Sequence, residues 1–207
     1  IFFRRAMWLQ LPCDVWDCIS VFLQSDALSH VCHRLWTTLG RRYVKAQCGN
    51  REEAKLERLV AVVNTAGPHG SPPALRVLEL DLLEGVRPGD SGMRALAALK
   101  DAPALHTLIL SVGPHSIGAS GTRALTALKH APSLHTLSLG LRANSVGDTG
   151  AQTLASLKDA PALHTLRLDL SSNSIGPIGA QALAALKQAP SLQVLTLDLG
   201  LNMVGDN

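Results

Sequence analysis

The sequence predicts an α/β fold: a solenoid with parallel strands on its concave face and helices on its convex face, preceded by a small all-α module. One phrase recurs five times, and self-similarity at a period of roughly 20–50 residues indicates a repeat architecture. Its lead leucines, at intervals of 30, 29, 29 and 29 residues, are Leu75, Leu105, Leu134, Leu163 and Leu192. All aromatic residues (three Phe, three Trp and one Tyr) and all four cysteines precede position 49. The 207-residue chain therefore consists of two parts joined end to end.

The front part predicts two short amphipathic helices. Residues 11–39 contain two apolar stripes at helical spacing, and Pro12 and Asp14 suit the first turn of the first helix. The stripes consist of Val15, Ile19, Phe22 and Leu23, then Leu28, Val31, Cys32 and Leu35. Trp16 and Trp36 lie beside these stripes, and two helices this short cannot bury both rings alone. We therefore expect this module to bind a partner.

Each repeat predicts a strand followed by a turn and a helix. In the fourth copy, Leu166, Leu168 and Leu170 alternate with Arg167 and Asp169, which places the leucines on one face of a strand and the charged residues on the other. An asparagine follows the strand at positions 144, 173 and 202, where its side chain suits bonding to backbone groups of a turn.

A helix rich in small residues follows each turn and ends before a proline. In the fourth copy it covers residues 179–186, with Leu183 and Leu186 facing inward, and Pro190 begins the return to the next strand. Ahead of the first strand, residues 51–66 predict a capping helix. We therefore predict a helical module over residues 1–50 and a solenoid over 51–207, with four full repeats and a partial fifth. Because the sequence starts at Ile1 and stops where another helix is due, we expect a fragment of a longer product.

The repeated phrase resembles the leucine-rich repeat family, in particular the strand-plus-helix units of about 29 residues in ribonuclease-inhibitor-like horseshoes. The resemblance covers residues 51–207. It departs from the usual spacing in one respect, since an extra Leu-x pair lengthens each strand. The resemblance implies a protein-binding solenoid.

The front segment resembles the F-box, the helical module by which substrate receptors dock onto the adaptor of Skp-Cullin-F-box ubiquitin ligases. The matches are Leu11-Pro12, Asp14-Val15, Ile19, Phe22-Leu23, Val31-Cys32 and Trp36, and the segment between Leu23 and Val31 is about three residues shorter than is usual in the family. The resemblance implies adaptor binding through residues 11–39, with the contacts Leu11, Pro12, Val15, Trp16, Ile19, Leu23, Val31 and Trp36. It also implies a protein substrate on the concave face of the solenoid.

Two sets of residues invite a metal-site interpretation. Cysteines and histidines between positions 13 and 33 lack the CxxC and paired-histidine spacings of zinc sites, so we interpret the thiols as buried. His106, His135 and His164 recur at one position and should stack about 5 Å apart, the spacing of strands. One interpretation of this repetition is a metal-binding or pH-sensing ladder, and the other is simple duplication of the unit. We favour duplication because the outer copies have Arg76 and Gln193 at the same position. We predict no metal and no cofactor.

Nothing in the sequence favours catalysis. The motifs Gly118–Gly121, Gly147–Gly150 and Gly176–Gly179 resemble phosphate or RNA clamps, but they recur in register at every strand-to-helix turn and are better explained as one turn used repeatedly. No Walker lysine follows them, and no Ser or Cys stands at a recognisable spacing from a base. We therefore predict that the chain is not an enzyme and has no small-molecule substrate.

The concave face is the predicted partner-binding surface of the solenoid. Its outward positions read Glu79 and Asp81, Ile109 and Ser111, Ser138 and Gly140, Arg167 and Asp169, and Thr196 and Asp198. This wall is mildly acidic at its ends and small and neutral at its centre. We expect it to accept a protein segment with basic or hydrogen-bonding side chains, and Arg167 is the one residue of a type that commonly anchors interfaces.

Composition narrows the remaining possibilities. With 46% hydrophobic residues and a net charge of +3, disorder is not expected. No window approaches the roughly 18 apolar residues of a membrane span, and the start lacks the features of a signal peptide. Residues 67–207 carry ten basic and ten acidic residues, so the small positive charge comes from the front and is no nucleic-acid footprint. We expect a cytoplasmic or nuclear protein.

The function that these expectations favour is substrate recognition in a ubiquitin ligase, without catalysis by this chain. The alternative is a leucine-rich-repeat scaffold or inhibitor whose front helices merely cap the solenoid.

Overall fold

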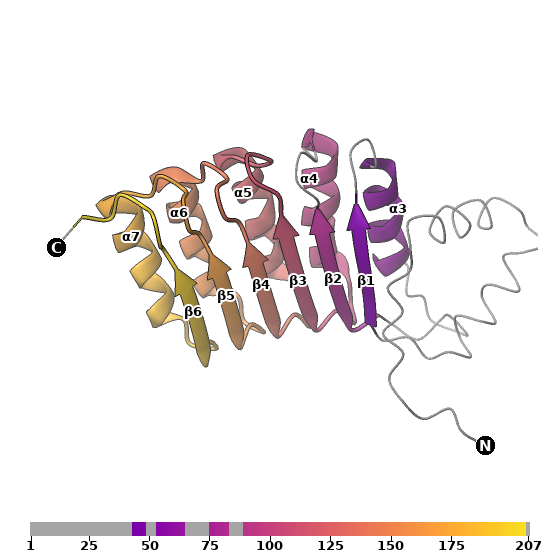
Figure 1. Cartoon of the computed structure of the whole chain (residues 1–207). Coiled ribbons are helices and arrows are strands. Elements are labelled where there is room, and N and C mark those ends of the chain that lie inside the picture. Colours follow the sequence, from indigo (N-terminus) through magenta and orange to yellow (C-terminus); the bar gives the residue numbers. More distant parts are fainter. Residues whose placement is uncertain (1–42, 49–52, 65–74, 83–88, 206–207) are drawn as a thin grey trace, which may run out of the picture.

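The computed structural model describes residues 43–48, 53–64, 75–82 and 89–205 (Figure 1). The predicted adaptor-binding residues and the front cysteines up to Cys32 lie outside these ranges. The described strands are β1 (Tyr43–Cys48), β2 (Val77–Leu82), β3 (Thr107–Val112), β4 (Thr136–Gly140), β5 (Thr165–Asp169) and β6 (Val194–Asp198). The α-helices are α3 (Glu53–Asn64), α4 (Gly89–Ala98), α5 (Ala119–Leu125), α6 (Gly147–Ala155) and α7 (Pro177–Ala184).

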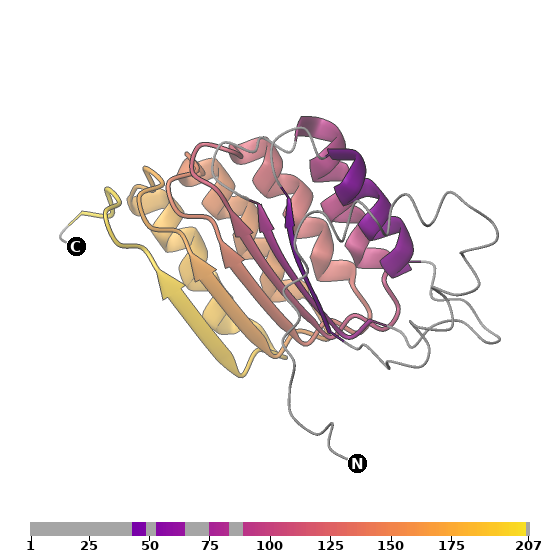
Figure 2. The same cartoon turned by 45° about the vertical axis from the view of Figure 1, so that its right-hand side comes forward.

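The strands form one parallel sheet in the order β1-β2-β3-β4-β5-β6. Each strand pairs with the next at the same position of the repeated phrase, for example Leu108 with Leu137 and Leu137 with Leu166. The helices lie side by side on one face of the sheet (Figures 1 and 2). This two-layer arrangement confirms the α/β solenoid predicted for the repeats.

The sheet begins earlier than we predicted. Residues 43–48, which we assigned to the front module, form β1 and pair with β2 along its whole length, from Tyr43 beside Val77 to Cys48 beside Leu82. The α3 helix therefore follows a strand of the same sheet, as the later helices do. The sequence did not indicate β1 because the segment lacks the leucine phrase; its pairing with β2 places it in the sheet.

Columns of leucine fill the space between the layers. The first strand leucines, Leu78, Leu108, Leu137 and Leu166, are fully buried, as are their helix partners Leu96, Leu125, Leu154 and Leu183. Stacked units bury identical aliphatic side chains against each other, which leaves no room for a ring in each unit. The predicted inward positions of Leu183 and Leu186 are confirmed, because both side chains are fully buried.

Short 3₁₀ turns connect the later helices to the strands that follow. They are η1 (Leu99–Asp101), η2 (Thr126–His130), η3 (Ser156–Asp159) and η4 (Ala185–Gln188). The alanine after each turn donates its N–H to the carbonyl of the turn's leucine, at 3.0–3.2 Å. Prolines 103, 132, 161 and 190 then prevent further helix, as predicted.

The turn asparagines link one unit to the next. The Oδ1 atom of Asn173 accepts hydrogen bonds from the backbone N–H groups of Asn144 and Val146, at 2.9 and 3.1 Å. Its Nδ2 group donates to the carbonyls of Leu141 and Ser171, at 2.8 and 3.0 Å. Asn202 repeats the pattern one unit later, where its Oδ1 accepts from the N–H of Asn173 at 2.8 Å. The expected backbone-bonding role of these residues is confirmed.

The β6 layer is more exposed than the layers before it. Leu195 is 37% exposed, whereas the equivalent Leu166 is fully buried, since β6 has a strand neighbour on one edge only within the described part of the chain. None of the helices in the described ranges is long and apolar enough to cross a membrane.

Candidate protein-binding face

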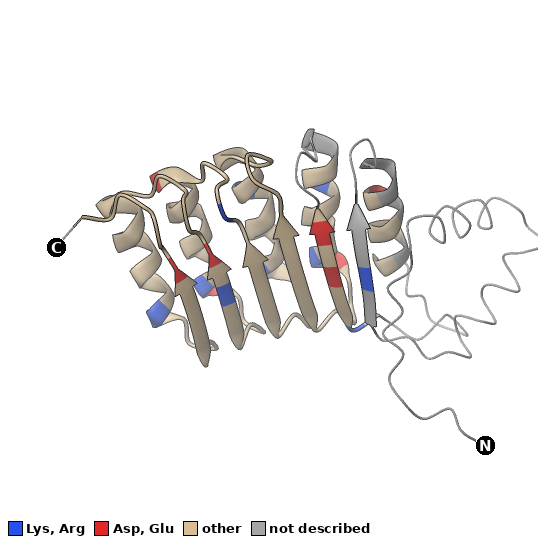
Figure 3. Ribbon diagram, in the orientation of Figure 1, with Lys and Arg blue, Asp and Glu red and all other residues tan. Residues whose placement is uncertain are grey.

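The strand residues that do not pack against the helices form one continuous surface, which we call the strand face. Strand register arranges it in rows, one per outward position, and two of these rows hold the residues predicted from the sequence. The first row is Lys45, Glu79, Ile109, Ser138, Arg167 and Thr196, and the second is Asp81, Ser111, Gly140, Asp169 and Asp198. Strand register therefore aligns all the concave-face residues predicted from the sequence in neighbouring positions of the sheet. Figure 3 shows where acidic and basic residues lie along the ribbon.

An ion pair occupies the β1 end of the strand face. Lys45 Nζ lies 2.5 Å from Glu79 Oε1, and both side chains are partly exposed. The hydrogen bond to Glu79 and then its negative charge raise the pKa of Lys45 above 10.5, so the ammonium is charged at physiological pH. Sequence analysis missed Lys45 because β1 was not expected, and the pair partly neutralises the acidic end that we predicted.

The centre of the strand face is lined by small residues. Ser111, Ser138 and Gly140 are adjacent in the register of β3 and β4. A Cβ built on Gly140 would have Ser111 Cα and Oγ as its nearest neighbours, at 3.6 Å, which is ordinary van der Waals contact. Neither packing nor a positive φ requires glycine here, so this position tolerates a larger side chain.

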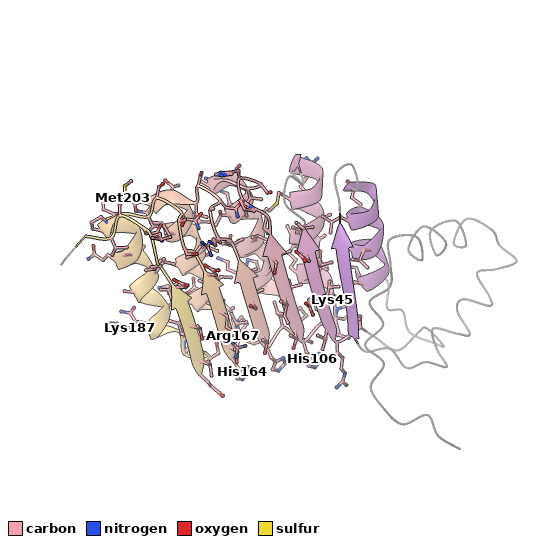
Figure 4. The ribbon with its side chains drawn as sticks, in the orientation of Figure 1. Lys45, His106, His164, Arg167, Lys187 and Met203 are labelled. Carbon is pink, nitrogen blue, oxygen red and sulfur yellow. The ribbon has the colours of Figure 1, made fainter. Side chains whose placement is uncertain are left out.

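Arg167 is the exposed cation of the β5 end. Its register neighbours are Ser138 and Thr196, and within the described ranges its guanidinium forms no ion pair (Figure 4). The carboxylates of Asp169 and Asp198 accept hydrogen bonds from the turns that follow their own strands. Asp169 Oδ1 accepts from Ser171 N–H at 3.1 Å and Ser171 Oγ at 2.6 Å, and Asp198 Oδ1 accepts from Gly200 N–H at 2.8 Å.

The glycine pairs of the strand-to-helix turns are structural. Asp148 in the first turn of α6 reaches the start of α7 in the next unit, where its Oδ1 accepts hydrogen bonds from the N–H groups of Gly176 and Gly179, at 2.7 and 2.9 Å. A carboxylate satisfies free N–H groups and favours the positive end of a helix. The interpretation of these motifs as turns rather than phosphate clamps is supported at this turn.

Replacing Gly179 with alanine is expected to lower the free energy of unfolding by about 2 kcal/mol, because the new Cβ overpacks the turn. It would lie 2.5 Å from Asp148 Oδ1 and 3.0 Å from Asp148 Cα. Urea unfolding followed by circular dichroism measures the effect. Gly118→Ala is the matched control, since a Cβ there meets nothing within 4 Å, and equal losses in the two variants would contradict the explanation.

The three repeated histidines stack as predicted. Ring centroids are 5.1 Å apart for both His106–His135 and His135–His164, with interplanar angles of 8° and 6°. The stack lies at the start of the strands, next to the strand face (Figure 4). No group of three or more His, Cys, Asp or Glu in the described residues could hold a metal ion.

A depression of about 350 Å³ lies between α3 and α4, on the helix layer. Alanine and valine line much of it, together with Glu57 and Arg94. Asn64 donates from Nδ2 to the carbonyl of Ala98 at 2.8 Å, while its Oδ1 is buried and has no hydrogen-bond partner among the described residues. None of the predicted site residues lies here, and the strand face remains the candidate site.

Parallel strands that recur about every 29 residues, leucine columns and the turn asparagines that follow β4, β5 and β6 define a leucine-rich-repeat type of solenoid. The comparisons with known proteins agree. A family described as "Leucine Rich repeat" matches residues 162–184. A solved structure, "Leiomodin-1 Actin-Binding Site 2 (ABS2)", is similar with a TM-score of 0.50 and 18% identity, covering 72% of this chain and 79% of that chain. At this identity the likeness shows the fold alone. No curated protein matches the chain.

Proposed function

We propose that this chain is a non-catalytic protein-interaction protein whose strand face binds a polypeptide segment. The observation that carries the proposal is Arg167, an exposed cation without an ion pair in the described part of the chain, next to a centre of small residues. Arginine commonly anchors protein interfaces, and the small residues around it allow a partner's backbone to approach.

The hydrogen bonds of the strand face refine the expected partner. Glu79 is paired with Lys45, and Asp169 and Asp198 accept hydrogen bonds from their own turns. These three carboxylates therefore already have partners within the chain, which makes the strand face less acidic toward a ligand than the sequence predicts. The proposed segment therefore carries hydrogen-bonding side chains and one carboxylate for Arg167. Its smaller residues lie over Ser111, Ser138 and Gly140.

Selection from a random peptide display library tests this proposal. Peptides enriched on the chain should contain Asp or Glu, and Arg167→Glu should abolish their binding. Gly140→Leu should weaken binding about tenfold, because the larger side chain blocks close approach of the peptide while β4 tolerates it. Lys187→Glu, a charge reversal in η4, is the matched control. Peptides that bind all three variants equally would overturn the strand face as the site.

The finer proposal is that the chain is a substrate-recognition subunit of a Skp-Cullin-F-box type ubiquitin ligase. What supports it is the F-box-like order of residues 11–39 directly before leucine-rich repeats. In this arrangement the front segment binds the adaptor and the strand face binds the substrate.

Co-purification with a Skp-type adaptor tests the finer proposal. Trp16→Ala or Ile19→Asp should abolish co-purification and leave the circular dichroism of the repeats unchanged, because both residues precede the repeats in the sequence. Gln24→Ala, outside both the proposed contacts and the apolar stripes, is the matched control and should keep co-purification. If the unmutated chain binds no adaptor of this type, the ligase proposal is wrong and the strand-face proposal still stands.

The second candidate is a scaffold or inhibitor in which the front segment caps the solenoid. The observation that favours it is that β1 begins at Tyr43, so residues 1–42 lead directly into the first strand of the sheet. Tryptophan fluorescence distinguishes the two candidates, because Trp8, Trp16 and Trp36 all lie in that segment. Blue-shifted emission from the chain alone favours the cap, and a blue shift only on addition of an adaptor favours the ligase subunit.

A further inference from the structure

The three stacked histidines, which we call the histidine row, form a second polar surface separate from the strand face. They stand immediately before β3, β4 and β5, and the backbone N–H of each bonds to the carbonyl of the residue one unit earlier: His106 to Arg76, His135 to His106, and His164 to His135, at 2.8–2.9 Å. His135 is exposed and the other two are partly exposed. The row is therefore both ordered by the backbone and open to a partner.

Each imidazole is held in one orientation by its own chain. The Nδ1 atoms of His106, His135 and His164 lie 2.6, 2.6 and 2.7 Å from the carbonyl oxygens of Ala104, Ser133 and Ala162. Because a carbonyl only accepts, Nδ1 carries the proton in each ring. The three Nε2 atoms are thus the ring nitrogens left for a partner, and each gains a proton and a positive charge when its imidazole is protonated.

Ring geometry excludes a metal ion shared by neighbouring histidines. The lone pair of Nε2 lies in the plane of its ring, and the planes are within 8° of parallel with centroids 5.1 Å apart. Such lone pairs run parallel and do not converge on one ion, whose bonds to nitrogen would be about 2 Å long.

The spacing fits one turn of an α-helix. Helical residues on one face repeat every 5.4 Å along the axis, close to the 5.1 Å between the rings. We infer that the histidine row binds an acidic α-helix of a partner protein that presents one carboxylate per turn. Protonated Nε2–H groups donate to the carboxylates, so binding takes up protons and strengthens as the pH falls.

The charges around the row favour an acidic partner. Arg76 occupies the position of the histidines in the β2 unit. The 3₁₀ turns that precede the three histidines contain the bases Lys100, Lys129, His130 and Lys158. The same turns contain two acids, Asp101, which pairs with Lys100, and Asp159. On the strand face, β2 and β5 contribute Glu79 and Arg167. In the described ranges none of these groups hydrogen-bonds to the three imidazoles. Bases therefore outnumber acids along this edge of the solenoid.

Fluorescence anisotropy with a synthetic helical peptide tests the inference. The peptide carries Glu at positions i, i+4, i+7 and i+11, and the control has the same composition with these residues distributed around the helix. Glutamate stays ionised at pH 5.5, so a change in binding reports on the protein. We expect the unmutated chain to bind the striped peptide roughly tenfold more tightly at pH 5.5 than at pH 7.5, and more tightly than the control peptide.

The matched variant replaces all three histidines with glutamine, the residue that Gln193 already supplies at this position. It should keep the circular dichroism of the repeats and lose the pH dependence of binding, whereas Arg167→Glu should leave that dependence intact. The inference is overturned if the glutamine variant retains the pH dependence or if the two peptides bind equally. It is also overturned if a single-stranded oligonucleotide competes as well as the striped peptide, because the edge would then be a general polyanion surface.

Discussion

Replacing Asn173 with alanine is expected to lower the free energy of unfolding by about 4 kcal/mol. The side chain is fully buried and bonds two backbone N–H groups and two carbonyls. Alanine leaves these groups without a partner, and each unsatisfied buried group costs about 1–3 kcal/mol where water cannot enter. Urea unfolding followed by circular dichroism measures the loss.

Asn202→Ala is the matched control for Asn173→Ala. It removes the same side chain one unit later, where Asn202 is only partly buried and water can satisfy the freed groups. We expect a loss of about 1 kcal/mol there. Equal losses at the two positions would show that burial does not set the cost and would refute the explanation.

Replacing Leu137 with alanine is expected to cost about 3 kcal/mol, because it opens a cavity in a filled leucine column. Leu137 is fully buried, with Leu108 and Leu166 as its register neighbours. Leu195→Ala makes the same change at the same position of the phrase, where the side chain is 37% exposed, and should cost about 1 kcal/mol. The two midpoints in urea provide the comparison, and a reversed order would contradict it.

The leucine phrase predicted most of the fold because periodicity and packing agree in it. Leu166 and Leu168 alternate with Arg167, and the same alternation sets both the buried column and the exposed row. β1 could not be predicted in this way, because residues 43–48 lack the leucine phrase. Only their pairing with β2 identifies them as a strand of the sheet. Residues 179–186, predicted as one helix, divide into α7 and η4, since the chain tightens before Pro190.

The sequence predicted the outward positions of β2 to β6 but missed Lys45 on β1, and it did not predict the hydrogen bonds of the candidate site. Period-two alternation placed Arg167 and Asp169 on the exposed face, and the register then aligned them with the outward residues of the other strands. The binding of Asp169 to the Ser171 turn depends on local loop geometry. The contact from Asp148 to Gly179 spans two units, and no spacing in the sequence indicates it.

Three neighbouring units present the same pair of residues to a ligand, a histidine followed by a threonine. The threonines are Thr107, Thr136 and Thr165, which are aligned by the strand register. A helix that contacts two of the three units can bind in two equivalent registers and can slide by one strand spacing without leaving the surface. Such sliding raises the probability of rebinding and blurs position along the solenoid. A ligand that contacts only the histidine row and these threonines therefore has no unique register along the solenoid.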